Sequence, residues 1–290
     1  MDLPNSKTLT ARNINGLVYY TFPALDALDF VRHGVSTRLG GASRSPYDAM
    51  NLSFGRGDDP DAVGENFRRF CAALGGKPED VVLSRQEHHV NIRNVTAVDR
   101  GKGVTRERDY TDVDGLITDE PGILLCTQYA DCVPLLFADP VKKVVAASHA
   151  GWKGTAAGIG RVTVEKMRAD YGCDPGDMMV GIAPSIGPCC FEVDAPVLEA
   201  FQKLAVFDEG CFTAKPHDKY MISLWEVNRR SLVAAGVRPG HITVTDLCTR
   251  CRPDLFWSHR AAGDKRGSLA AMIGVNLHDK RMNERNMNNR

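Results

Sequence analysis

The segment from Tyr129 to Gly158, YADCVPLLFADPVKKVVAASHAGWKGTAAG, holds the residues best suited to chemistry. Cys132 and His149 stand at the borders of two apolar runs that are typical of buried strands. A thiol and an imidazole on neighbouring strands can act as a nucleophile and its general base. They can equally bind a metal ion, or pack in the core, which is the common fate of a free cysteine. The residue types leave these alternatives open.

A metal site would require a third ligand from another part of the chain. His88 and His89 follow an apolar run at residues 80–84, and one of them could join Cys132 and His149. Three protein ligands with one open position are typical of catalytic zinc sites. The sequence therefore permits a metal site that is assembled from three separate segments.

The other cysteines do not indicate a zinc finger. Such a site needs two ligand pairs at set spacing, and the chain has one CxxC sequence, Cys248 to Cys251, with no second one to match it. Cys189 and Cys190 are adjacent in a predicted turn, and we expect that they cannot easily point at one site. The chain has nine cysteines and no export signal, so we expect free thiols in a reducing cytoplasm.

Two glycine-containing segments could bind an anion. In GWKGTAAG, the glycines let the backbone approach a ligand, Lys153 carries a positive charge, and a predicted helix start near Thr155 offers free N–H groups. In the long loop that begins TRLGG, Arg38 could make a bidentate contact with an oxyanion. These features favour an anion such as phosphate or carboxylate, while a simple strand-to-helix turn and a solvated loop arginine remain the alternatives.

Apolar periodicity and turn residues predict a mixture of strands and helices. Asp58 or Asp59, before Pro60, is suited to cap the first long helix. No repeat, linker or shift of composition marks a boundary, so one α+β domain is predicted. Strands are expected at residues 17–22, 29–36, 80–84, 123–137, 143–149, 178–184, 241–247, 254–259 and 268–275, and helices at 60–74, 155–171, 194–205 and 219–235.

The composition is that of an ordinary soluble globular protein, with 43% hydrophobic and 25% charged residues in a chain of 290. The 36 basic residues equal the 36 acidic residues, which gives no preference for nucleic acid or membrane as a partner. No run approaches the roughly 20 apolar residues that a membrane-spanning helix needs. We therefore expect a cytoplasmic protein with neither nucleic acid nor membrane as its partner.

Seven ordered motifs resemble the laccase-domain family, whose members are also named multicopper polyphenol oxidase-like proteins, peptidoglycan editing factors and purine nucleoside phosphorylases of the laccase-domain type. The resemblance covers residues 17–277, with tails at 1–16 and 278–290. The motifs are HGVSTRLGGAS, NLSFGRGDDPDAVGEN, Gln86-x-His88, DGLITDEPGILLCTQYADCVPLLFADP, AASHAGWKGTAAGI, GIAPSIGPCCFEV and DLCTRCRPDLFWSHRAAGDKRGSLAAMIGV.

The resemblance implies a fold, a metal and an activity. The fold would be a single-domain four-layer α/β/β/α sandwich, similar to the catalytic domain of cytotoxic necrotizing factor toxins. One zinc ion would be held by His88, Cys132 and His149. The activity would be phosphorolysis of adenosine, inosine, guanosine and methylthioadenosine, with adenosine deamination beside it, in a monomer or homodimer. The residues expected to contact the nucleoside and phosphate are Arg38, Lys153, Asp131 and Arg260.

Three positions depart from the family pattern. Lys153 stands where Arg is usual, so a point charge replaces a planar fork. His89 stands where Gly is usual and offers a competing ligand beside His88. His259 stands where an aromatic residue, often Tyr, precedes the Arg matched by Arg260.

Other functions use the same residues differently. A metal-free hydrolase would employ Cys132 as nucleophile and His149 as base, but it gives His88 no role. Copper-dependent phenol oxidation is a weaker alternative, because a multicopper oxidase needs many more histidines than the eight scattered ones in this chain. Editing of cell-wall precursors would also suit an anion-binding turn.

Overall fold

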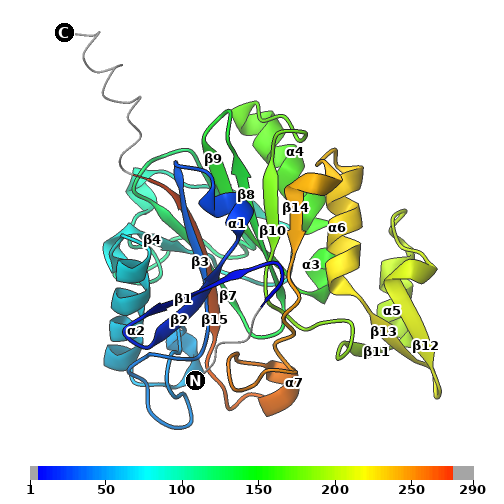
Figure 1. Cartoon of the computed structure of the whole chain (residues 1–290), viewed down its shortest axis with the longest axis horizontal. Helices are drawn as coiled ribbons and strands as arrows, with labels where there is room; N and C mark the ends of the chain where they lie inside the picture. Colours follow the sequence, from blue (N-terminus) through cyan, green and yellow to red (C-terminus); the bar gives the residue numbers. More distant parts are fainter. Residues whose placement is uncertain (1–5, 277–290) are drawn as a thin grey trace.

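The computed structural model describes residues 6–276 and shows two six-stranded β-sheets packed against each other (Figure 1). The apolar cluster between them includes Leu125 and Ile273 from one sheet and Leu136 and Val145 from the other. Helices cover the outer faces of both sheets, so the layers run helix, sheet, sheet, helix. The predicted single-domain α+β architecture is confirmed.

The first sheet has its outer face covered by α2 (Pro60–Ala73). The Asp59 side chain caps this helix by accepting a hydrogen bond from the Asp61 N–H at 3.0 Å. Phe67 and Phe70 of the helix are fully buried, and each stabilises the fold by about 1.5–3 kcal/mol. The strands lie in the order β1 (Thr10–Ile14), β2 (Leu17–Thr21), β3 (Val31–Ser36), β15 (Leu269–Val275), β7 (Leu124–Tyr129) and β4 (Val81–Leu83).

The second sheet has its outer face covered by α4 (Ile159–Tyr171) and α6 (Leu224–Ala234). Its centre is the antiparallel pair β8 and β9, which is buried along its whole length. The strands lie in the order β14 (Ile242–Val244), β10 (Met179–Ile182), β8 (Val133–Asp139), β9 (Val144–Ala150), β6 (Gly115–Thr118) and β5 (Ile92–Asn94).

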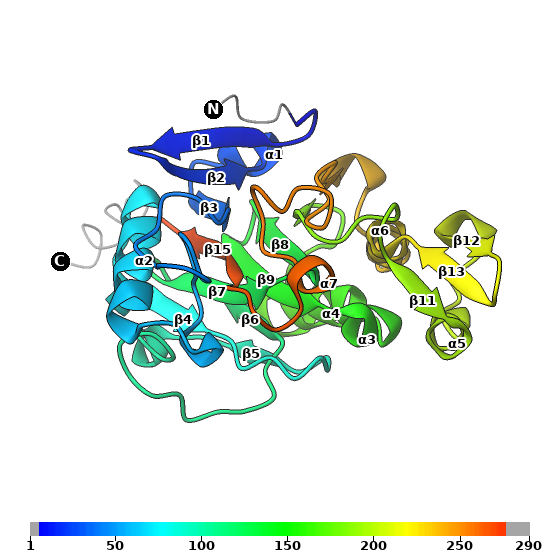
Figure 2. The same cartoon turned by 90° about the horizontal axis from the view of Figure 1, so that it is seen from below.

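A small third sheet projects from the body beside α6 (Figure 2). It carries α5 (Ala195–Gln202) and has the strand order β11 (Glu192–Asp194), β13 (Lys219–Ile222) and β12 (Phe212–Lys215). The remaining short helices are α1 (Pro23–Asp26), α3 (Trp152–Ala156) and α7 (His259–Ala262). None of the helices within residues 6–276 combines the length and hydropathy of a membrane-spanning segment.

The predicted strand at 123–137 is wrong in one respect, because it is two strands. The chain bends between β7 and β8 at residues 130–132, where Asp131 has a φ of 90°. This left-handed conformation cannot continue a strand. The predicted helix at 155–171 is likewise two helices, α3 and α4, separated at Gly158, which has a φ of 78°.

Three further predictions need correction. The expected helix at 219–235 begins as strand β13, and α6 begins at Leu224. Ser223 caps α6, because its side chain accepts a hydrogen bond from the Glu226 N–H. Residues 254–259 form turns that lead into α7 rather than a strand. The expected tail at 1–16 contains β1, which pairs with β2. The expected tail at 278–290 lies outside the described residues.

Candidate active site

His88 lies in the loop that follows β4, and its backbone is fixed by Asp114. Its φ of 66° is unusual for a residue other than glycine. The N–H groups of Glu87, His88 and His89 all donate to the two carboxylate oxygens of Asp114, at 2.9, 3.0 and 3.1 Å. These three hydrogen bonds hold the loop in a conformation that would otherwise be strained.

The Gln86 side chain ties the same loop to β7. Its amide oxygen accepts from the Gln128 N–H at 2.7 Å, and its amide nitrogen donates to the Gln128 carbonyl at 2.8 Å. The Gln86 side chain thus makes the two hydrogen bonds to β7 that a backbone residue would make if β4 continued past Leu83. This contact explains why a glutamine two residues before His88 helps to position that histidine.

Cys132 follows the bend between β7 and β8, and Asp131 holds the bend in place. The Asp131 carboxylate accepts from Thr249 Oγ1 at 2.6 Å, from the Arg260 N–H at 2.7 Å and from Ser258 Oγ at 3.0 Å. Three donors from the segment between β14 and β15 therefore anchor the residue that precedes the thiol. Asp131 is 9% exposed, and its carboxylate binds these protein groups rather than lining the cavity.

His149 is near the end of β9 and is 2% exposed. Its Nδ1 donates to Asp114 Oδ1 at 2.8 Å, and the His149 N–H donates to the Asp114 carbonyl at 2.7 Å. Because Nδ1 is occupied by this hydrogen bond, Nε2 is the ring nitrogen that can bind a metal ion, once it has lost any proton of its own. A carboxylate that fixes the tautomer in this way is common behind metal-binding histidines.

The structure brings His88, Cys132 and His149 together. One ligand atom from each lies within 4.8 Å of the others. The two imidazole rings are edge to face with centroids 4.9 Å apart, and the His88 Nε2 is 3.9 Å from the Cys132 Sγ. Two imidazoles and one thiol at this separation fit a three-ligand metal site with an open fourth position.

Gly151 is required by the close approach of these side chains. A Cβ at this position would lie 2.7 Å from His88 Cδ2 and 3.2 Å from the Cys132 Sγ. The first of these distances is shorter than any ordinary contact between carbon atoms. Gly151, two residues after His149, is therefore needed for space beside the three ligands, rather than for its conformational freedom.

The thiol and the imidazole also shift each other's protonation. Burial raises the pKa of Cys132, but the charge and hydrogen bonds of His149 and His88 outweigh burial and lower the pKa to about 6. Burial lowers the pKa of His149, but Cys132 and Asp114 outweigh it and raise the pKa to about 9. Without a metal ion, the pair is a thiolate and an imidazolium at neutral pH. A metal ion would displace the Nε2 proton of His149.

His89 does not compete with His88 for this position. Its Nδ1 lies 2.7 Å from Asp112 Oδ1, and its side chain is 60% exposed. It is not among the three residues that approach one another.

A cavity of about 320 Å³ opens onto the three ligands and is lined by four arginines, Arg56, Arg85, Arg108 and Arg266. None of the four forms an ion pair with a carboxylate of residues 6–276. Arg266 is only 6% exposed, and its Nε has no hydrogen-bond partner within the described part of the chain. Burial, with the charge of Arg56, lowers the pKa of Arg266 to about 10, so it remains charged at neutral pH. The cavity is suited to an anion.

The basic residues expected to bind the anion lie elsewhere. Arg38 stacks on Trp257 at 3.8 Å, and its guanidinium donates to the carbonyls of Asp48 and Pro253 at 2.9 Å each. Lys153 extends over its neighbour Trp152, with Nζ 5.7 Å from the centroid. Neither residue lines the cavity. Since α3 has only five residues, the turn after His149 offers little helix dipole.

Arg260 also lies outside the cavity lining. Its Nη1 donates to the Glu192 carbonyl at 3.0 Å and lies 3.5 Å from the Cys190 carbonyl. The backbone N–H of the same residue donates to Asp131. These contacts link the segment after β14 to the start of the third sheet, and they indicate a positioning role.

Sequence reasoning missed Asp114 and the four cavity arginines. Asp114 immediately precedes the apolar strand GLIT, and an acidic residue there was a detectable signal, since carboxylates are seldom fully buried without partners. The arginines come from distant loops and share no local spacing. Only the tertiary structure brings them together.

Comparison with known proteins agrees with this arrangement. The purine nucleoside phosphorylase YlmD of Geobacillus stearothermophilus is 38% identical over 246 residues, which are 83% of this chain and 89% of that protein. The purine nucleoside phosphorylase YfiH of Escherichia coli is 34% identical over 239 residues, which are 82% of this chain and 91% of that protein. The crystal structure of the hypothetical protein YfiH from Bacillus licheniformis has a TM-score of 0.86 at 34% identity, covering 92% of this chain and 99% of that one.

A family model matches residues 32–276, a range that contains all three metal-type ligands and all four cavity arginines. The extent of this match and the identities above show that the chain belongs to the family described as multi-copper polyphenol oxidoreductase laccase.

Proposed function

We propose that this protein is a zinc-dependent purine nucleoside phosphorylase that also deaminates adenosine. The observation that carries the proposal is one cavity that joins three metal-type ligands to four arginines, none of which forms an ion pair with a carboxylate of residues 6–276. Relatives named purine nucleoside phosphorylase supply the reaction type. In this reaction a phosphate oxygen bonds to C1′ of the pentose, the bond from C1′ to the purine nitrogen breaks, and the purine takes up a proton.

The donor set supports zinc as the metal. Cys132 has a lowered pKa and is readily a thiolate, and His149 presents Nε2 because Nδ1 is bound to Asp114. Imidazole and thiolate are both common zinc ligands, and three protein ligands with an open position are typical of catalytic zinc. A zinc ion there would supply Lewis acidity to a bound substrate or water, which deamination requires.

The four arginines support phosphate as the second substrate. Arg266 is almost fully buried and its Nε has no hydrogen-bond partner among residues 6–276, so a phosphate oxygen could accept from it without displacing a contact of this region. Arg56 and Arg108 line the same cavity and would share the remaining charge. Holding a dianion beside the sugar orients it for attack and stabilises the charge as it moves.

Phe54 is a candidate platform for the purine ring. It lines the cavity, is 38% exposed, and stacks on Phe67 with centroids 5.6 Å apart. An exposed aromatic ring supported from behind offers a flat face to a heterocycle, and base stacking of this kind contributes about 1–3 kcal/mol. A Phe54→Ala substitution should therefore raise the KM for nucleoside more than the KM for phosphate.

The decisive experiment uses the purified protein with its zinc content measured. With inosine and phosphate it should release hypoxanthine and ribose 1-phosphate in equal amounts, and neither product should form without phosphate. With adenosine and no phosphate it should form inosine and ammonia. A Cys132→Ala variant should lose zinc and both activities. No release of hypoxanthine by the zinc-loaded protein would contradict the phosphorylase assignment.

A metal-free Cys–His hydrolase is the second candidate, because Cys132 and His149 form a thiolate–imidazolium pair. It predicts that the protein without zinc is the active form and that Cys132 becomes acylated. Oxidation of phenols after copper loading, or turnover of muramyl-peptide precursors, would instead favour the oxidase or the editing factor. Each substrate is assayed on the same preparation, with zinc and with copper.

A further inference from the structure

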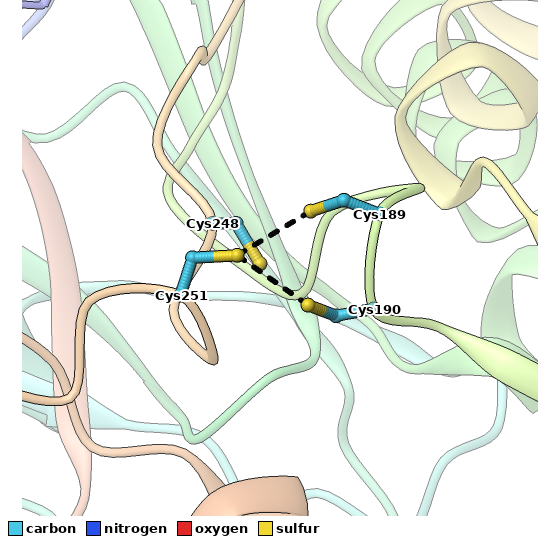
Figure 3. Close-up of side chains that lie close together, drawn as sticks. All are labelled: Cys189, Cys190, Cys248 and Cys251. Carbon is cyan, nitrogen blue, oxygen red and sulfur yellow. Dashed lines mark hydrogen bonds between the residues drawn. The ribbon is translucent and has the colours of Figure 1, made fainter.

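Four cysteines outside the active site have their sulfur atoms close together (Figure 3). Cys189 and Cys190 come from the loop between β10 and β11, and Cys248 and Cys251 come from the loop after β14. One thiol sulfur from each lies within 4.8 Å of the other three. The expectation that Cys189 and Cys190 could not share one site is therefore wrong.

The local backbone explains how the adjacent pair converges. The Cys190 and Phe191 N–H groups both donate to the Gly187 carbonyl at 3.0 Å, so residues 187–191 form a tight turn. Successive side chains point to opposite faces only in a strand. In this turn the sulfurs of Cys189 and Cys190 instead lie on the same side and face Cys251.

Backbone contacts join the two loops, and a backbone N–H also donates to one of the sulfurs. Ser185 and Cys248 form a parallel bridge, and the Thr249 N–H donates to the Ser185 carbonyl at 3.0 Å. The Gly187 N–H donates to the Cys248 Sγ at 3.2 Å. A Cβ on Gly187 would lie 3.2 Å from the Cys248 Cβ and 3.3 Å from the Cys189 Sγ. The fold therefore places the four sulfurs together by backbone contacts.

We propose that Cys189, Cys190, Cys248 and Cys251 bind one structural zinc ion. Zinc holds four thiolates in a tetrahedron with Zn–S distances of about 2.3 Å, which puts the sulfurs about 3.8 Å apart. The Cys251 Sγ lies 3.4 Å from that of Cys190 and 3.6 Å from that of Cys189. An iron–sulfur cluster has several irons and bridging sulfides between its cysteines, so it needs a wider arrangement than this one.

The surroundings suit a tetrathiolate ion of net charge −2. Arg250, inside the CxxC sequence, places its Nη1 3.8 Å from the Cys190 Sγ. Hydrogen bonds from Gly187 and Arg250 to sulfur are the contacts that stabilise metal-bound thiolates. Cys189 and Cys251 are exposed, which leaves an entry path for the ion.

This ion would stabilise two parts of the molecule. It would close the chain between residues 190 and 248, which contains the third sheet and α6. It would also fix Thr249, which lies between two of the ligands and donates to Asp131 at 2.6 Å, beside Cys132. The structural zinc therefore supports the wall of the active site without touching the substrate.

The test counts zinc in protein purified under reducing conditions, by elemental analysis. The wild-type chain should hold two equivalents of zinc. Cys251→Ser and Cys132→Ser should each remove one equivalent, and the double variant should remove both. Cys173→Ser, which changes a buried thiol outside both groups, should leave two. If the wild-type chain holds one equivalent of zinc and Cys132→Ser holds none, the proposal of a structural zinc is overturned. The separate proposal of an active-site zinc would stand.

A second measurement covers the case in which Cys251→Ser does not fold. Cobalt loaded into Cys132→Ser protein should give the intense thiolate-to-metal absorption of a tetrathiolate site, because all four cysteines are unchanged. Absence of these bands would overturn the proposal. Disulfides joining Cys251 to Cys189 or Cys190 in freshly reduced and desalted wild-type protein would overturn it as well.

Discussion

The Nδ1 of His149 lies 2.8 Å from Oδ1 of Asp114, and both side chains are almost fully buried. The same carboxylate accepts the backbone N–H groups of residues 87, 88 and 89. One buried group therefore fixes the ring of one metal-type ligand and the backbone of another. These four donors and the buried position of Asp114 make it the centre of the site, although it does not face the cavity.

Asp114→Asn should weaken zinc binding about 10–100-fold, the usual effect of removing a carboxylate behind a metal-binding histidine. The amide nitrogen of Asn cannot accept a hydrogen bond. It would therefore place its N–H groups against the donor of His149 or against the backbone N–H groups of residues 87–89. Zinc affinity is measured by competition with a chromogenic chelator. The control is Asp112→Asn, which changes the partner of exposed His89 and should leave the affinity unchanged. Equal effects of both variants would contradict the role of Asp114.

Gly151→Ala should abolish zinc binding while the protein remains folded. The backbone of Gly151, with φ of −61° and ψ of 167°, is open to alanine. Its Cβ would nevertheless lie 2.7 Å from His88 Cδ2 and force the ligand away. Zinc content and circular dichroism are measured together. Gly64→Ala, in the interior of α2 where a Cβ meets nothing within 4 Å, should keep zinc and gain about 0.5–1 kcal/mol of stability.

The residues alone left His88 and His89 as alternatives, and the resemblance to the laccase-domain family named the three metal-type ligands, because each stands in one of its short motifs. His88 follows Gln86, Cys132 follows Asp131, and His149 precedes Gly151. In the structure each neighbour has a clear role, since Gln86 pairs with Gln128, Asp131 holds the bend, and Gly151 leaves space. Long apolar strands and α2 were predicted for a similar reason, since their periodicity is strictly local.

The arginines of the cavity could not be predicted in the same way. Arg38 and Lys153 stand beside glycines, which made them the local candidates, but packing against Trp257 and Trp152 draws them away from the cavity. The breaks at Asp131 and Gly158 were missed because a residue with left-handed φ can end a strand or helix while the apolar pattern of the sequence continues. The group of four cysteines was missed because the adjacent pair Cys189 and Cys190 is far in sequence from the CxxC segment, and only the tertiary structure brings the two together.

Arg266→Lys should raise the KM for phosphate about 10-fold or more with a smaller change in the KM for nucleoside. Lysine keeps the positive charge but loses the planar fork, and a hydrogen bond to a charged group contributes about 1.5–3 kcal/mol. Steady-state kinetics with inosine at varied phosphate measures both constants. Lys153→Ala is the control, because Lys153 does not line the cavity. A larger effect of Lys153→Ala would place the phosphate at the turn after His149 instead.

His33 should make the protein less stable in mild acid. Its side chain on β3 is 1% exposed, its Nε2 accepts from the Phe22 N–H at 2.8 Å, and its Nδ1 is 3.8 Å from Asp26. Burial, opposed by Asp26, lowers the pKa of His33 to about 4. The unfolded chain takes up a proton near pH 6.5, and the folded chain does not do so until about pH 4. Stability therefore falls as the pH falls through this window and levels off below it.

The size of this effect follows from about 1.4 kcal/mol per pKa unit, which gives a loss of about 3 kcal/mol between pH 7 and pH 4. Urea unfolding at several pH values measures it. In His33→Gln the amide oxygen can still accept from Phe22, but it does not titrate, so the variant should lack this part of the acid sensitivity. His217→Asn, in the exposed turn between β12 and β13, should retain it. An unchanged pH dependence in His33→Gln would show that His33 is not the group responsible.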